Sequence, residues 1–107
     1  MAEVTLTKSN FEQSTSQGVS LVDFWAPWCG PCRMQGPIVE SVAEKVGDKA
    51  TVAKCNVDEA QDLAMQFGIQ SIPTLVVLKD GEPVQKFVGL QSEEAILESL
   101  RKEGVEV

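Results

Sequence analysis

Apolar positions along the chain recur with two periods, and the changes of period outline the elements. Residues 20–25 are almost continuously apolar, which is typical of a strand buried on both faces. From Pro31 to position 46, apolar residues recur at helical spacing, which predicts a long helix with a buried stripe of Met34, Ile38, Val42 and Val46. Shorter apolar runs predict strands at 4–6, 50–57, 74–78 and 84–88.

Polar residues mark the helix starts and turns between these runs. Ser9 followed by Glu12 fits a capping box. Asp58 is expected to cap a short helix and Ser92 to open the last one. Asp80-Gly81 between two apolar runs predicts a β-hairpin. The resulting alternation predicts an α/β fold, with one mixed β-sheet of about five strands flanked by about four helices.

Composition narrows the class of protein. A length of 107 residues suits a single domain spanning 1–107, and 43% hydrophobic with 23% charged residues is ordinary for a globular chain. A net charge of −7 repels phosphate backbones, so no nucleic-acid partner is expected. No apolar stretch approaches the roughly 20 residues of a membrane helix, and residues 1–5 lack signal-peptide features. We therefore expect no membrane association.

The cysteines point to a reducing compartment. There are three, and Cys29 and Cys32 are only three positions apart, whereas a secreted scaffold would use more cysteines in even number. We expect a cytoplasmic protein; the plastid stroma is the alternative if the sequence is a processed form. The sequence has no histidine and Cys55 has no second ligand nearby, so no metal site is expected. Cys55 is expected to be a buried, inert thiol, and a regulatory role, which would need exposure, is the alternative.

The spacing of Cys29 and Cys32 suits a bond that is made and broken. Residues three apart at a helix start share a face, with Cβ atoms about 5–6 Å apart, and a disulfide needs about 3.8 Å. So short a ring contributes little stability on the entropic model, and a helix N-terminus favours the thiolate. Three alternatives remain. A structural disulfide is disfavoured by the small ring, an inert buried pair by the position at a helix start, and half of a zinc site by the lack of four ligands.

Residues 22–34, centred on Trp28-Cys29-Gly30-Pro31-Cys32, closely resemble the active-site signature of the thioredoxin family. The resemblance extends over about residues 3–102, and further matches in order and spacing are Pro37, Lys54, Asn56, Asp58, Ile72-Pro73-Thr74, Asp80-Gly81 and Gly89. It implies the thioredoxin fold. Pro27 replaces an acidic residue of many bacterial members, as in plastid and some bacterial forms. Gln35-Gly36 stands where bulkier residues are common, and Cys55 is additional.

The resemblance implies a role for each residue of the redox site. Cys29 would be the attacking thiolate, and Cys32, the more buried of the two, would resolve the mixed disulfide. Asp23 matches the buried general base of the family, with its pKa raised toward neutrality, and Lys54 would lie near it and tune its charge. From the residues alone, an exposed aspartate at the strand end remains an alternative for Asp23.

The resemblance also implies a surface that binds substrate. Ile72 and Pro73 would be joined by a cis peptide facing the disulfide, leaving the backbone of Ile72 open to pair with an extended substrate segment. An apolar rim around the disulfide would complete the surface. Its expected members are Trp28, Gly30, Pro31, Ile72, Val88 and Gly89. Trp25 is expected to pack beside the site.

The function implied is reduction of protein disulfides by dithiol–disulfide exchange. The chain would bind no cofactor, act as a monomer, and be reduced again by a thioredoxin reductase (flavin and NADPH) or by a ferredoxin-linked reductase. Two alternatives remain. A disulfide isomerase or oxidant could share the fold, although Gly30-Pro31 between the cysteines and the lack of a signal peptide argue against it. A non-catalytic docking subunit, alone or in addition, is the other.

Overall fold

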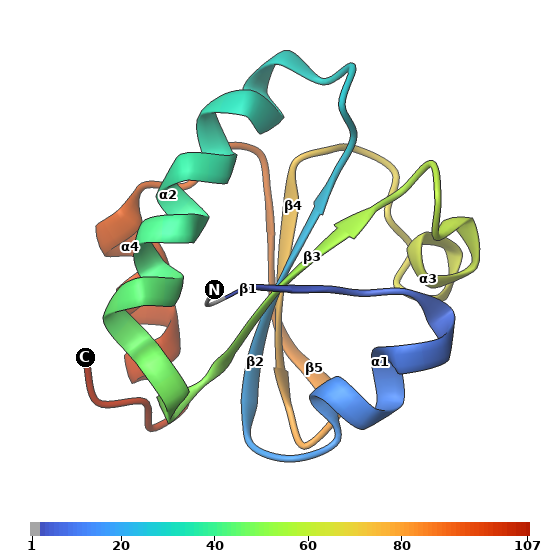
Figure 1. The fold of residues 1–107 in the computed structure, drawn as a ribbon. Helices are drawn as coiled ribbons and strands as arrows, with labels where there is room; N and C mark the ends of the chain where they lie inside the picture. Colours follow the sequence, from blue (N-terminus) through green and yellow to red (C-terminus); the bar gives the residue numbers. More distant parts are fainter. Residues whose placement is uncertain (1–2) are drawn as a thin grey trace.

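The computed structural model describes residues 3–107, whose helices and strands alternate in the predicted order (Figure 1). The elements are β1 (Glu3–Thr5), α1 (Lys8–Thr15), β2 (Val19–Trp25), α2 (Gly30–Val46), the 3₁₀ turn η1 (Gly47–Lys49), β3 (Thr51–Asn56), α3 (Gln61–Gln66), β4 (Thr74–Lys79), β5 (Glu82–Val88) and α4 (Glu93–Arg101). The strands form one mixed sheet in the order β1-β3-β2-β4-β5. The predicted α/β architecture is therefore confirmed.

β2 lies at the centre of the sheet. It pairs with β3 in parallel and with β4 antiparallel, while β1 pairs with β3 in parallel and β5 with β4 antiparallel. β4 and β5 are joined by the predicted hairpin turn. Asp80 and Gly81 both have positive φ, at 50° and 86°, as a two-residue hairpin of this hand requires.

Both faces of the sheet are covered, which explains the continuous apolar run in β2. Val19 and Leu21 pack under α2 and α4, whereas Val22 and Phe24 pack against the layer of α1 and α3. Figure 1 shows these two helix pairs on opposite sides of the strands. Alternate side chains of one strand therefore enter two separate apolar clusters. No helix within residues 3–107 is long and apolar enough to cross a bilayer.

The predicted buried stripe of α2 is confirmed at Val42 and Val46 and half-buried at Ile38, but it is wrong at Met34. Met34 is 62% exposed, whereas Gln35 is fully buried. The residues of α2 that face the sheet are Cys32, Gln35, Val39, Val42, Ala43 and Val46. The sequence pattern did not indicate a buried position for Gln35, because glutamine is polar. Its burial is possible because its amide hydrogen-bonds to the backbone of another segment, as described below.

Two predicted helix caps are also wrong, and one is confirmed. α1 is capped by Thr7 rather than Ser9, and the Thr7 backbone N–H donates to Asn10 Oδ1 at 2.8 Å. α3 starts after Ala60, so Asp58 does not cap it. Serine and threonine are both good caps and lie two positions apart here, so composition could not choose between them. Ser92 does cap α4, because its hydroxyl accepts from the Ala95 N–H at 3.1 Å.

Candidate active site

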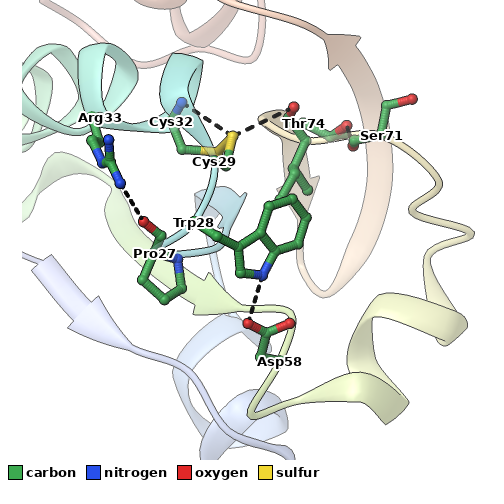
Figure 2. The surroundings of a disulfide bond; sticks show 9 residues. Pro27, Trp28, Cys29, Cys32, Arg33, Asp58, Ser71 and Thr74 are labelled. Atoms are coloured by element: carbon green, nitrogen blue, oxygen red, sulfur yellow. Dashed lines mark hydrogen bonds between the residues drawn. A yellow bond between two sulfur atoms is a disulfide. The ribbon is translucent and has the colours of Figure 1, made fainter.

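The site lies where β2 ends and α2 begins. Cys29 is the N-cap of α2 and is joined to Cys32 by a disulfide, with the Cα atoms 5.3 Å apart. The Cys32 backbone N–H donates to Cys29 Sγ at 3.2 Å, as Figure 2 shows. Pro31 lies in the first turn, where a missing N–H removes no helical bond. The start of α2 thus directs a backbone donor at the first sulfur.

The disulfide is set in a small apolar cluster. Cys29 and Cys32 pack with Ala26, and Trp25, Val57 and Ile72 pack around them. Each cysteine is 5% exposed, so the expectation that Cys32 is the more buried residue is not borne out. Cys29 Sγ lies 3.7 Å from the Ile72 carbonyl oxygen, and the Ile72-Pro73 peptide is cis, as the resemblance implied. The loop before β4 therefore faces the sulfur of Cys29.

Two large apolar side chains of the expected rim are exposed. Trp28 is 66% exposed and Val88 is 61% exposed. The Trp28 indole N–H donates to Asp58 Oδ2 at 2.8 Å, so the Asp58 carboxylate binds this side chain rather than capping α3 (Figure 2). Gly30 and Pro31 are exposed, Ile72 and Gly89 half-buried and Pro73 buried. The Gly89 N–H donates to the Pro73 carbonyl at 2.8 Å, so the two loops of the expected rim are joined directly.

Asp23 is an ionisable residue inside the sheet. It is 1% exposed, and neither carboxylate oxygen has a hydrogen-bond partner among residues 3–107. The alternative of an exposed strand-end aspartate is therefore excluded. Burial raises the pKa of Asp23 to about 7, while the positive charge of Lys54 acts to lower that pKa and the negative charge of Glu3 to raise it.

Lys54 is the register partner of Asp23 on the adjacent strand β3. It is half-buried, and its Nζ lies 4.6 Å from the centroid of the Trp25 ring, a cation–π distance. Trp25 and Asp23 are two residues apart in β2, so their side chains lie on the same face of the sheet. Lys54 thus lies near the buried acid, as the resemblance implied, and it also contacts the tryptophan beside the disulfide.

Two further residues of this region were missed from the sequence. Burial raises the pKa of Glu3, which Lys54 acts to lower and Glu40 to raise, and Glu3 Oε2 is buried without a hydrogen-bond partner among residues 3–107. Glu3 is paired with Val52 of β3, two residues before Lys54, so the Glu3 and Lys54 side chains share one face of the sheet. Gln35 is the other, since its side chain pairs with the backbone of Gln91. No local signal in the sequence marks that contact.

Cys55 lies on the opposite face of the sheet. It is fully buried, and burial, followed by the nearby charge of Asp62, raises the pKa of its thiol to about 11. The expectation that this thiol is buried is confirmed; that it is inert stays a prediction, because only the thiolate is nucleophilic and burial disfavours it. No group of three or more His, Cys, Asp or Glu side chains in the described part of the chain could hold a metal ion.

A disulfide at the N-cap of a helix that follows a central strand, with an exposed tryptophan next to it in the chain, is typical of a thiol–disulfide oxidoreductase. The thioredoxin family model matches residues 2–102. The chain is 50% identical over 102 residues to the thioredoxin of Bacillus subtilis, covering 95% of this chain and 98% of that one. It is 54% identical over 97 residues to the thioredoxin of Alicyclobacillus acidocaldarius, covering 89% and 91%.

A solved structure gives the same result. A mutant thioredoxin from Halobacterium salinarum superimposes with a TM-score of 0.89 at 41% identity, over 98% of this chain and 92% of that one. The chain therefore belongs to the thioredoxin family. Its fold is the thioredoxin fold, and its activity is that of a protein-disulfide reductase that works through the Cys29–Cys32 pair.

Proposed function

We propose that Cys29 attacks the substrate disulfide and that Cys32 resolves the intermediate. In the reduced protein, the Cys29 thiolate displaces one substrate sulfur, which leaves as a thiolate and is protonated, and a mixed disulfide forms. Cys32 then attacks Cys29 Sγ, the second substrate sulfur leaves, and the Cys29–Cys32 disulfide forms. Two electrons pass from the dithiol to the substrate. The observation that carries the order of attack is the Cys32 N–H directed at Cys29 Sγ, a contact that would stabilise a thiolate there.

In this proposal Asp23 is the general base for the Cys32 thiol. A base works best when its pKa is near the working pH, and the pKa of Asp23 is about 7 because the carboxyl is buried. Its oxygens have no other partner among residues 3–107, so their lone pairs are available for a proton. Lys54 limits the rise of that pKa, because its positive charge favours the ionised carboxylate.

The substrate surface that we propose surrounds the disulfide. Its members are Trp28, Gly30, Pro31, Ile72, Pro73, Val88 and Gly89. The support is the exposure of Trp28 and Val88, since large exposed apolar side chains beside a reactive group are typical of a binding surface. An extended substrate segment would pair with the backbone of Ile72, which places a substrate sulfur next to Cys29.

We further propose that the chain acts as one domain, 1–107, and as a monomer in the cytoplasm, with the plastid stroma as the alternative compartment. A thioredoxin reductase would return two electrons to the disulfide, so flavin, NADPH or ferredoxin would be used by that partner and no cofactor bound here. The cytoplasm or stroma is supported because a dithiol that is oxidised and reduced again in each cycle requires a reducing compartment. The charge of −7 disfavours a nucleic-acid partner.

Turnover of a disulfide-bonded protein, with NADPH and a thioredoxin reductase, tests the proposal. Cys29→Ser should abolish turnover, because no attacking thiolate remains. Cys32→Ser should also stop turnover but accumulate a covalent complex with the substrate that dithiothreitol releases. If Cys29→Ser retains turnover, or if Cys32→Ser gives no complex while Cys29→Ser does, the assigned order of attack is wrong.

A further inference from the structure

Gln35 is a polar side chain in a fully buried position, three residues after Cys32 on α2. A buried amide is costly unless its hydrogen bonds are made. Gln35 Oε1 accepts from the Gln91 backbone N–H at 2.8 Å, and Gln35 Nε2 donates to the Gln91 carbonyl at 3.0 Å. The two partners fix which end of the amide is which, because one is a donor and the other an acceptor. The amide thus pairs with Gln91 as a neighbouring strand would.

Gln91 belongs to the connection between β5 and α4, which passes beside the first half of α2 (Figure 1). Its side-chain Nε2 donates to the Gly89 carbonyl at 3.4 Å, and the Gly89 N–H donates to the Pro73 carbonyl at 2.8 Å. Pro73 follows Ile72, whose carbonyl lies 3.7 Å from Cys29 Sγ. A continuous series of contacts therefore joins the helix of the cysteines to both loops of the proposed substrate surface.

We propose that Gln35 is a positioning residue for substrate binding, which holds the segment of Val88 and Gly89 at a fixed place relative to Cys29. Gln35 does not touch the reacting sulfurs. Its effect is to order the loop before substrate arrives, so that binding does not have to supply that ordering. The inference rests on the proposed substrate surface, because it assigns a cause to the position of one half of that surface.

Gln35→Met tests this role. Methionine has nearly the same length and volume but makes neither hydrogen bond, so the packing of α2 is largely kept while Gln91 is released. Gln13→Met is the matched control, since it makes the same chemical change at an exposed position of α1, on the other side of the sheet. Gln91→Ala is a milder variant, because it removes the side-chain contact to Gly89 and keeps both backbone bonds to Gln35.

Three measurements separate positioning from general stability. For Gln35→Met we expect KM for a protein disulfide to rise on the order of tenfold, with kcat within about twofold, as expected for loss of one or two hydrogen bonds that order the bound surface. Reduction of a small aromatic disulfide, which does not need the surface, should be unchanged. Hydrogen exchange at the Gln91 and Gly89 amides should accelerate. Gln91→Ala should raise KM by less, and Gln13→Met not at all.

Two results would overturn the proposal. One is faster exchange at Gln91 with an unchanged KM, because the loop would then be released without consequence. The other is an equal loss of rate with the protein and the small disulfide, which would indicate a disturbed redox centre. If Gln35→Met does not fold, an unchanged KM for Gln91→Ala with faster exchange at Gly89 contradicts the proposal. Failure of the proposed function differs from all of these, since it would appear as turnover by Cys29→Ser.

Discussion

Cys29 and Cys55 lie near the carboxyl ends of two neighbouring parallel strands, β2 and β3, and meet different surroundings there. Cys29 caps α2, and its sulfur accepts a backbone N–H. Cys55 is buried with Phe24 and Leu63 in the layer of α1 and α3, where burial raises the pKa of its thiol to about 11. In the proposed function the same functional group is activated at a helix start, whereas inside an apolar layer burial disfavours its thiolate.

The two faces of the sheet differ in a second way. The face under α2 carries the ionisable residues Asp23 and Lys54 beside each other, whereas the buried strand residues Val22, Phe24 and Cys55 on the α1 and α3 face carry no charge. Side chains alternate along each strand, so one residue decides which face a group enters. The surroundings of a polar side chain in β2 or β3 therefore depend on which face of the sheet it points to, as well as on its residue type.

Among variants outside the cysteine pair, the largest effect is expected from removing Asp23, the buried acid of the face under α2. Asp23→Ala should slow release of substrate from the mixed disulfide on the order of a hundredfold near pH 7, because a positioned base contributes that much or more. Formation of the mixed disulfide should change little. Rapid-quench kinetics with a labelled substrate separate the two steps. Asp48→Ala, at an exposed acid, is the control; equal slowing of both steps by Asp23→Ala would contradict the assignment of Asp23 as the base.

The same buried acid should make stability fall as pH rises. Its pKa is about 7 when folded because of burial, against an ordinary value near 3.9 when unfolded, so between these values the folded state holds the extra proton. The contribution of protonated Asp23 to the free energy of unfolding is then fully present below about pH 4. It is lost as the pH rises toward 7, by on the order of 3–4 kcal/mol. Urea unfolding of wild type and Asp23→Ala at pH 4 and pH 7.5 measures this. Asp23→Ala should gain stability relative to wild type at the higher pH; a constant difference would contradict the buried, raised acid.

Two variants should move the pKa of Asp23 in opposite directions. Lys54 lowers that pKa and Glu3 raises it, so Lys54→Met should raise it further and Glu3→Gln should lower it. The carboxyl carbon resonance of Asp23 followed against pH measures both. Shifts of the same sign would show that the charges do not act on Asp23 as the strand register suggests.

The smallest effect on activity is expected on the inert face. Cys55→Ala should leave turnover unchanged, because Cys55 belongs to the apolar layer of α1 and α3. It should lower the free energy of unfolding by about 1–2 kcal/mol, since a buried sulfur is replaced by a small cavity. Turnover and urea unfolding of the same preparation check both. A marked loss of turnover with unchanged stability would give Cys55 a part in the chemistry.

Local sequence signals were sufficient for the frame of the fold. The apolar run in β2 indicated a strand covered on both faces, and Asp80-Gly81 indicated the hairpin, because a turn with two positive φ values admits few residue types. The redox pair could be recognised for a similar reason, since its spacing and its place at a helix start are both local.

The contacts that the sequence could not supply join distant segments. Gln35 pairs with Gln91, 56 positions away, so a buried polar residue interrupted the apolar stripe of α2 with no visible partner. Asp58 was predicted from the sequence to cap a helix, but its carboxylate instead accepts the indole N–H of Trp28, 30 positions earlier. Glu3 joins the surroundings of Lys54 through strand register alone. Each of these depends on how elements pack, which local propensity does not encode.

Competitive labelling of the reduced protein tests the contrast between the cysteines most directly. A limiting amount of iodoacetamide at pH 7 is followed by peptide mapping of all three thiols. We expect Cys29 to be carboxamidomethylated first, because the Cys32 N–H is directed at its sulfur, and Cys32 much more slowly. Cys55 should react only after unfolding, because burial disfavours its thiolate. Labelling of Cys32 or Cys55 at the rate of Cys29 in the folded protein would contradict this account.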